Sequence, residues 1–271
     1  MGHGAHIGST RYRRVPVLAV TPPLVSGIVI AQNEEHNIAR CLNSLRWVDQ
    51  LIVIDAMSFD NTVPIARAFG ADVYVREWPG YVAQQRYALS KAEGTWVISL
   101  DADEELEPGL VEEIQAALSN VSSEISGFDM PRKCLYLGKW IRHGEWYPDR
   151  KLRLIRRSKG RVIGENPHYG FSVIGNVGSL DGHILHYSYV GVIDHFRRMQ
   201  RYSTLMAENM YRTGVRWSVR QMILEPATRA VRNYVQLAGY RDGYQGILIS
   251  IFIFYYVFRK HFELCRLQRA N

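Results

Sequence analysis

Residues 96–103 read Trp96-Val97-Ile98-Ser99-Leu100-Asp101-Ala102-Asp103. A short, nearly continuous apolar run that ends in polar residues is typical of a buried strand. Similar runs occupy residues 24–31, 51–54 and 72–75, and segments with helical spacing of apolar residues separate them. Strands that alternate with helices in this way predict an α/β fold, with a mostly parallel central sheet covered on both faces.

Helices are expected between these strands, at residues 38–45, 62–69, 81–92 and from Pro108 onward. Gly70 suits the end of the second helix, and Pro108 suits the first turn of the fourth. After about residue 125 the pattern changes to short strands, at residues 127–133, 151–157, 173–174 and 183–189.

The composition narrows the class of protein. The 271 residues are 47% hydrophobic and carry a formal charge of +7, which excludes a disordered chain and indicates an anionic partner. Three well-separated cysteines favour a reducing compartment and no disulfide framework.

The chain opens without the apolar segment of a secretory signal, so we expect it on the cytosolic side. Without GxGxxG or GxxxxGK[ST], neither a dinucleotide dehydrogenase nor a P-loop NTPase is indicated.

The C-terminal part is basic and aromatic. Nine arginines lie between residues 195 and 242, and the uncharged stretch 243–258 has 16 residues, fewer than the roughly 20 that a spanning helix needs. This combination favours a peripheral helical anchor on an anionic membrane over a nucleic-acid-binding surface. The alternative is burial of residues 247–258 against a second copy of the chain, because exposed apolar patches are unusual on monomers.

The strand ends carry the candidate chemistry. Asp101 and Asp103 can share one divalent cation whose other ligands are phosphate oxygens and water. Their alternative role is an acidic helix N-terminus. Asp55 can accept a hydrogen bond from a nucleobase or ribose, whereas for Asp60 helix capping is the favoured interpretation.

These segments together resemble the family 2 glycosyltransferases, and within them the lipopolysaccharide core glucosyltransferases. The resemblance rests on residues 28–35 (IVIAQNEE), 55–62 (DAMSFDNT) and 99–105 (SLDADEE), and it extends to 144–150 (GEWYPDR), 153–157 (RLIRR) and 186–189 (HYSY). It covers roughly residues 24–260. The implied fold is a single Rossmann-like nucleotide-sugar transferase domain with an amphipathic helical C-terminal region.

The resemblance also implies site residues. It places Mg²⁺ or Mn²⁺ on Asp103, with Asp101 contacting the metal, its bound water or the ribose. The donor nucleotide sugar would be held by residues from three strand ends and one helix: Ala31, Asn33, Glu34, Asp55, Gln84 and Arg86. For Arg86 a solvated helix face is an equal alternative. Acceptor contacts are expected from Trp146, Tyr147 and Arg153, although Arg153 also fits a charged sheet face.

Inversion at the anomeric carbon requires a general base on the acceptor side. This branch usually has an acidic residue directly after a histidine, but here Tyr169 follows His168. A neutral tyrosine is a poor base near pH 7, so the role could pass to Glu165, His168, Asp149 or Glu145, of which we favour Glu165.

The expected protein is thus an inverting, metal-dependent enzyme that moves a hexose from a UDP-sugar to a lipid-linked or cell-envelope glycan such as lipopolysaccharide core. It would act at the cytoplasmic side of the inner membrane and bind no nucleic acid. Residues 1–23 would form an extension, 24–190 the catalytic domain and 191–271 the membrane-associating or oligomerising region. The alternatives are a polyprenyl-phosphate sugar synthase, a nucleotidyltransferase and a non-catalytic nucleotide-sugar-binding scaffold.

Overall fold

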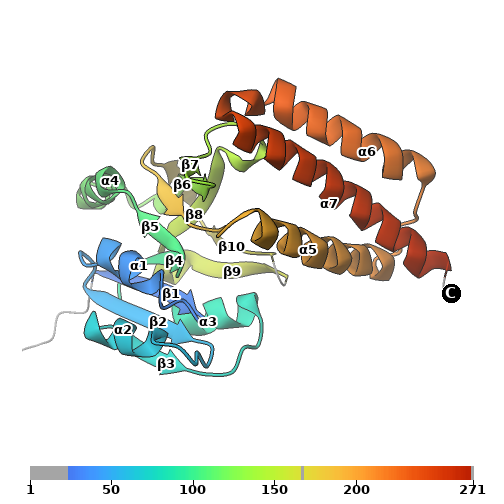
Figure 1. The fold of residues 1–271 in the computed structure, drawn as a ribbon. Coiled ribbons are helices and arrows are strands. Elements are labelled where there is room, and N and C mark those ends of the chain that lie inside the picture. Colours follow the sequence, from blue (N-terminus) through green and yellow to red (C-terminus); the bar gives the residue numbers. More distant parts are fainter. Residues whose placement is uncertain (1–23, 166–167, 270–271) are drawn as a thin grey trace, which may run out of the picture.

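The computed structural model describes residues 24–165 and 168–269 (Figure 1). The expected N-terminal extension, residues 1–23, lies outside the described part. A curved sheet with its helices forms one body, and three C-terminal helices extend from one side of it (Figure 1).

The first half of the sheet is parallel, as predicted. Its strands lie in the order β3 (Asp72–Val75), β2 (Gln50–Asp55), β1 (Val25–Ala31) and β4 (Trp96–Asp101). All seven residues of β1 are buried, which explains why the strand is apolar on both faces.

Helices cover both faces of this half-sheet. They are α1 (Ile38–Ser44), α2 (Thr62–Ala68), α3 (Tyr81–Lys91) and α4 (Pro108–Ser119). Val29 packs with α1, α2 and α4 in one core, and its neighbour Ile28 packs with α3 in a second core. Gly70 has φ +79° after α2, and Pro108 opens α4, so both predicted helix boundaries are confirmed.

The second half of the sheet is mixed. Beyond β4 follow β8 (Asp149–Arg156), β6 (Ile125–Tyr136), β12 (Ile184–His186) and β5 (Glu104–Leu106). Two short strands also pair with β6, namely β7 (Lys139–Trp140) and β11 (Asn176–Ser179). The strands β9 (Gly160–Glu165) and β10 (His168–Val173) form a separate hairpin.

The structure extends or shortens several predicted elements. The strand expected at residues 173–174 is the end of β10, and the one expected at 183–189 is limited to β12. Residues 101–107 do not begin a helix, because β5 intervenes before α4. The acidic residues after β4 are therefore not explained by a helix N-terminus.

The C-terminal part consists of α5 (Val192–Arg212), α6 (Val219–Val231), a π-helical turn (Arg232–Gln236), a 3₁₀ turn (Gly239–Asp242) and α7 (Tyr244–Arg269). Helix α7 packs against both α5 and α6 (Figure 1). A third core of Tyr136, Ile141 and Ile249 joins α7 to β6. Within the described residues, the helices are all too short or too polar to cross a bilayer.

Candidate active site

The carboxyl ends of three parallel strands meet at one edge of the sheet. In the strand register Ala31 pairs with Asp55, and Ile30 pairs with Asp101. The order of strands reverses at β1, and open α/β sheets bind ligands outside the strand ends at such a point. The predicted residues Ala31, Asp55 and Asp101 are therefore brought together by the backbone itself.

The loops after β1 and β2 are hydrogen bonded to each other. Asp55 is fully buried, and its carboxylate accepts from the Ser58 N–H at 2.8 Å and the Ser58 hydroxyl at 2.5 Å. Ser58 Oγ in turn accepts from the Asn33 N–H at 2.8 Å, and Asn33 Oδ1 accepts from the Phe59 N–H at 3.0 Å. Asn33 and Asp55 thus hold the two loops in one shape at the predicted nucleoside position.

Glu34, Glu35 and Asp60, which follow in the same two loops, make further contacts between the loops and at the start of α2. Asp60 accepts hydrogen bonds from the N–H groups of Thr62 and Glu35, at 3.0 and 3.1 Å, so its predicted capping role is confirmed. Burial raises the pKa of Glu34, while the positive charge of Arg198 acts in the opposite direction. Arg198 belongs to α5, so this helix contributes positive charge near Glu34.

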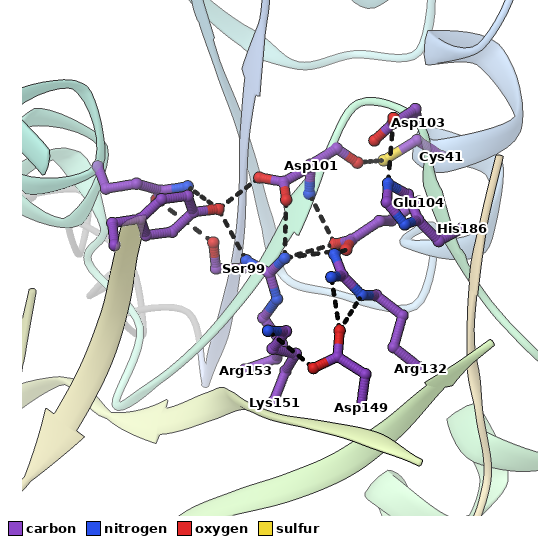
Figure 2. Close-up of polar contacts among 12 residues, drawn as sticks. Cys41, Ser99, Asp101, Asp103, Glu104, Arg132, Asp149, Lys151, Arg153 and His186 are labelled. Atoms are coloured by element: carbon purple, nitrogen blue, oxygen red, sulfur yellow. Dashed lines mark hydrogen bonds and ion pairs between the residues drawn. The ribbon is translucent and has the colours of Figure 1, made fainter. Parts of the chain in front are cut away.

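Asp101 is held by the buried Arg153 and the partly buried Tyr169 (Figure 2). Its Oδ2 lies 2.8 Å from Arg153 Nη2, and its Oδ1 accepts a hydrogen bond from the Tyr169 hydroxyl. Arg153 also donates to Tyr169 Oη at 2.9 Å. Burial raises the pKa of Tyr169 far above its usual range, so the residue is a hydrogen-bond donor to Asp101 rather than a base.

Glu104 lies directly behind this group and is fully buried (Figure 2). Arg153 contacts it at 2.8 Å and Arg132 at 2.7 Å. Burial by itself would raise the pKa of Glu104, but the two guanidinium groups outweigh burial and lower it. Arg132 also pairs with Asp149 at 2.6 Å, and Lys151 does so at 2.9 Å. Asp149 is thus an ionised partner of two cations, which does not suit a general base.

Asp103 points toward His186, at the end of β12 (Figure 2). The distance from Asp103 Oδ2 to His186 Nε2 is 3.2 Å, and His186 Nδ1 lies 3.3 Å from Cys134 Sγ. Burial disfavours the imidazolium, but the contacts with Asp103 and Cys134 prevail and raise the pKa of His186 to about 10.

In the absence of a metal His186 is therefore protonated and pairs with Asp103, and a divalent cation would have to displace that proton before the imidazole could join Asp103 as a ligand. The described residues include no group of three or more metal-ligating side chains, so Asp103 and His186 could supply only part of the coordination. Mg²⁺ commonly takes one or two protein ligands and completes its shell with substrate phosphates and water. The residues therefore fit a cation that binds together with a diphosphate. His186 lies in the segment 186–189 that contributed to the family resemblance, but it was not predicted as a metal ligand.

The remaining predicted donor contacts lie on α3. Gln84 is fully buried, and in the described chain neither its Nε2 nor its Oε1 has a hydrogen-bond partner. Its neighbour Gln85 donates to Tyr169 Oη at 3.1 Å. Arg86 is exposed. A buried amide without partners costs about 1–3 kcal/mol, which a bound ligand can relieve.

The predicted acceptor residues divide into two groups. Trp146 stacks on Tyr189 with ring centroids 5.2 Å apart, and the Tyr147 hydroxyl lies 3.0 Å from His183 Nε2. Arg153 is not with them, because its buried guanidinium contacts Asp101 and Glu104.

The segment that carries Trp146, η1 (Gly144–Trp146), is held by the C-terminal region. Asp242 is buried and accepts from the His143 N–H at 2.8 Å. Asn233 Oδ1 accepts from the Glu145 N–H at 2.7 Å, and Asn233 Nδ2 donates to Ser250 Oγ of α7 at 2.8 Å. A Cβ atom on Gly144 would lie 2.5 Å from Asn233 Oδ1, so the close approach requires glycine.

The model of glycosyl transferase family 2 matches residues 26–174, from β1 to the loop after β10. The chain belongs to this family. It is therefore a glycosyltransferase, and the resemblance found in the sequence is confirmed. The helices α5–α7 lie beyond the matched region.

Relatives cover almost the whole glycosyltransferase. The lipopolysaccharide core biosynthesis glycosyltransferase LpsC of Rhizobium meliloti is 29% identical over 231 residues, which are 83% of this chain and 85% of LpsC. An uncharacterized glycosyltransferase of Rickettsia typhi, RT0209, is 27% identical, with 91% and 87% of the two chains covered. Among solved structures, glucosyl-3-phosphoglycerate synthase of Mycobacterium tuberculosis, in complex with Mn²⁺, UDP and glucosyl-3-phosphoglycerate, has a TM-score of 0.47 at 20% identity, with 72% and 82% covered.

The candidates for the general base of this glycosyltransferase lie in different surroundings. Glu145 pairs with Arg229 at 2.6 Å and with Arg232 at 3.6 Å, and Asp149 is paired as described above. Glu165 is exposed at the end of β9, and within the described residues no ion pair engages it. The side chain of His168 lies outside the described part. Glu165 is therefore the carboxylate among them that remains free to accept a proton.

Proposed function

We propose that this glycosyltransferase moves a hexose from a UDP-sugar to a lipid-linked or cell-envelope glycan, such as lipopolysaccharide core, with inversion at the anomeric carbon. The observation that carries the proposal is the Asp103–His186 pair, which lies beside the carboxyl ends of β1, β2 and β4. A lipopolysaccharide core acceptor is further supported by the similarity to LpsC over 83% of the chain.

The donor would lie across the strand ends. Its nucleoside would bind against the loops that Asn33 and Asp55 hold together, with Ala31 beneath it. The unpaired amide of Gln84 is a buried group that a donor could satisfy. Arg198 adds positive charge on the side where Glu34 lies, which favours an anionic ligand there.

Mg²⁺ or Mn²⁺ would be held by Asp103 and His186, and it would supply positive charge that stabilises the departing diphosphate. Asp101 would contact the ribose or a metal-bound water, and its ionised form is maintained by Arg153 and by the Tyr169 hydroxyl. The acceptor hydroxyl would lose its proton to Glu165, and Trp146 and Tyr147 would border the acceptor.

The test is turnover of the donor. Purified protein is incubated with UDP-hexoses and core-truncated lipopolysaccharide in detergent, with Mn²⁺ or with EDTA. We expect UDP release and a β-configured product from an α-configured donor only when the metal is present. Release of pyrophosphate would instead identify a nucleotidyltransferase, and transfer to polyprenyl phosphate alone would identify a sugar-phosphate synthase. UDP binding without turnover of any donor would contradict the catalytic assignment.

We further propose that the enzyme lies on the cytoplasmic face of the inner membrane through α7. Six exposed apolar or aromatic side chains follow one face of this helix: Tyr244, Ile247, Ile251, Phe254, Phe258 and Phe262. Residues 191–269 contain thirteen Lys and Arg against five Asp and Glu, whereas residues 24–190 contain seventeen against twenty-one. An apolar stripe on the cationic part of the chain suits an anionic bilayer surface.

Liposome flotation tests this membrane contact. We expect the enzyme to float with vesicles that contain phosphatidylglycerol, and less with vesicles of phosphatidylcholine. Replacing both Phe254 and Phe258 with serine should weaken flotation by at least about tenfold, because each buried phenylalanine contributes about 1.5–3 kcal/mol. The control is Phe59→Ser, since Phe59 is 90% exposed but far from α7 in the chain. A stable dimer that does not float would show that α7 binds a second copy instead.

A further inference from the structure

A cavity of about 940 Å³ lies between α5, α7 and the end of β9. One face of α5 forms its long wall, through residues three or four positions apart: His195, Met199, Tyr202, Met206, Asn209 and Thr213. Helix α7 forms the opposite wall with Ile249, Phe252, Ile253 and Tyr256. The family model ends before both helices, but the cavity is also lined by Glu145, Trp146, Gly164 and Glu165 of the matched region, so it lies where the two parts of the chain meet.

Much of the lining of this cavity is apolar. Met199, Met206, Phe252 and Ile253 contribute to it, and methionine side chains adapt to flexible apolar ligands. His195 is only 1% exposed, and burial lowers its pKa to about 4, so the ring is uncharged at neutral pH.

Two of the charged side chains that line the cavity, Glu145 and Arg229, are paired with each other at 2.6 Å and so compensate each other's charge. A phosphate that lay against Met199, Met206, Phe252 and Ile253 would lose hydrogen bonds to water without replacement. A hydrocarbon chain has no such cost, and its burial there is favourable.

Glu165 is exposed and Tyr202 is half-buried, so the part of the cavity that they line, its mouth, opens to solvent. Glu165 belongs to the same hairpin as Tyr169, whose hydroxyl contacts Asp101, so this mouth lies on the side of the strand-end carboxylates. Arg212, which is exposed, also lines the cavity and can attract an anionic headgroup.

We propose that this cavity binds one hydrocarbon chain of the acceptor lipid, with the polar headgroup at the mouth beside Glu165 and Tyr202. The inference rests on the proposed function, because it gives the acceptor of that reaction a lipid tail held by the enzyme itself. Helix α7 separates the cavity from the exposed stripe, since Ile253 lines the cavity while Ile251, two residues away and on the opposite side of the helix, is exposed.

The experiment uses n-alkyl phosphates as probes, at concentrations below micelle formation, and measures binding to the full-length protein by calorimetry. Each added methylene should tighten binding about fourfold, so decyl phosphate should bind about 15-fold more tightly than octyl phosphate. Inorganic phosphate should not bind detectably at the cavity. Equal affinities for the two alkyl chains would overturn the inference, as would glucose binding as tightly as octyl glucoside, which would indicate a saccharide site.

Two tryptophan variants locate the binding. Met206→Trp places a bulkier ring in the apolar part of the cavity and should weaken octyl phosphate binding at least about tenfold, while Ile251→Trp, on the exposed stripe of α7, should not. Equal effects of the two variants would contradict binding in the cavity. The wild-type chain-length series remains decisive even if Met206→Trp does not fold.

UDP binding, measured in the same preparations, separates this inference from the proposed function. Wild-type protein and Met206→Trp should bind UDP equally. A protein that binds UDP and turns over donor without any dependence on alkyl chain length refutes the cavity assignment alone. One that binds alkyl phosphates but not UDP refutes the proposed reaction.

Discussion

Replacing Asp103 with asparagine is expected to reduce kcat by about 10²- to 10³-fold, because a preorganised charge aimed at the departing diphosphate is lost. The variant keeps the size of the side chain but removes the charge that pairs with His186, so we also expect a lower free energy of unfolding near pH 7, measured by urea denaturation. Binding of Mn²⁺, followed by electron paramagnetic resonance in the presence of UDP, should weaken by at least about tenfold. This second readout does not depend on catalysis and reports on the Asp103–His186 pair directly.

The matched control is Asp72→Asn. Asp72 is exposed at the amino end of β3, on the opposite edge of the parallel sheet from the strand ends. It should keep wild-type kcat and Mn²⁺ binding. If Asp103→Asn also kept wild-type kcat and wild-type Mn²⁺ binding, the cation would have to bind elsewhere. His186 would then not be a metal ligand.

Replacing Glu104 with alanine is expected to lower the free energy of unfolding by about 3–5 kcal/mol. Glu104 is fully buried between Arg153 and Arg132, and Arg153 is only 5% exposed. Without the carboxylate, two guanidinium groups would keep their desolvation cost and lose their shared partner. Urea denaturation followed by circular dichroism measures the change.

Glu105→Ala is the matched control, since it removes the same group from the adjacent residue of β5. Glu105 lies 3.6 Å from Arg40 in a partly exposed pair, and such pairs contribute about 0–1 kcal/mol. The difference between the two variants therefore isolates the buried network. Equal losses of stability in the two variants would show that the buried ion pairs of Glu104 contribute no more than the partly exposed pair of Glu105.

Most of the parallel half of the sheet could be predicted because β1, most of β4 and the end of β2 are buried. The runs at residues 24–31, 51–54 and 96–100 are mostly apolar, broken only by Ser26, Gly27 and Ser99, and they are short and separated by helical segments, which favours strands. The edge strand β3 is partly exposed and could be predicted from its place in the same alternation. By contrast, β5 contains Glu104 and Glu105, and it is a strand only because it pairs with β12 and buries Glu104 against two arginines. Such a strand depends on tertiary contacts that its own sequence does not reveal.

The same distinction applies to the site. Asp101 and Asp103 could be predicted, since they follow a recognisable strand directly. Their partners could not be assigned, because Tyr169 is 68 residues from Asp101 in the chain and His186 lies on a strand three residues long. Arg153 looks like a surface residue in an arginine-rich segment, and only its pairing with buried Glu104 shows that it is internal.

Asn233 links two distant parts of this enzyme through a single side-chain amide. One end of the amide holds the backbone of Glu145, next to Trp146, and the other holds Ser250 on α7. A displacement of α7 can therefore reach the indole ring of Trp146 through one hydrogen-bonded side chain. With the membrane contact and the acceptor site that we propose, the lipid surface under α7 would also influence how the enzyme meets its acceptor.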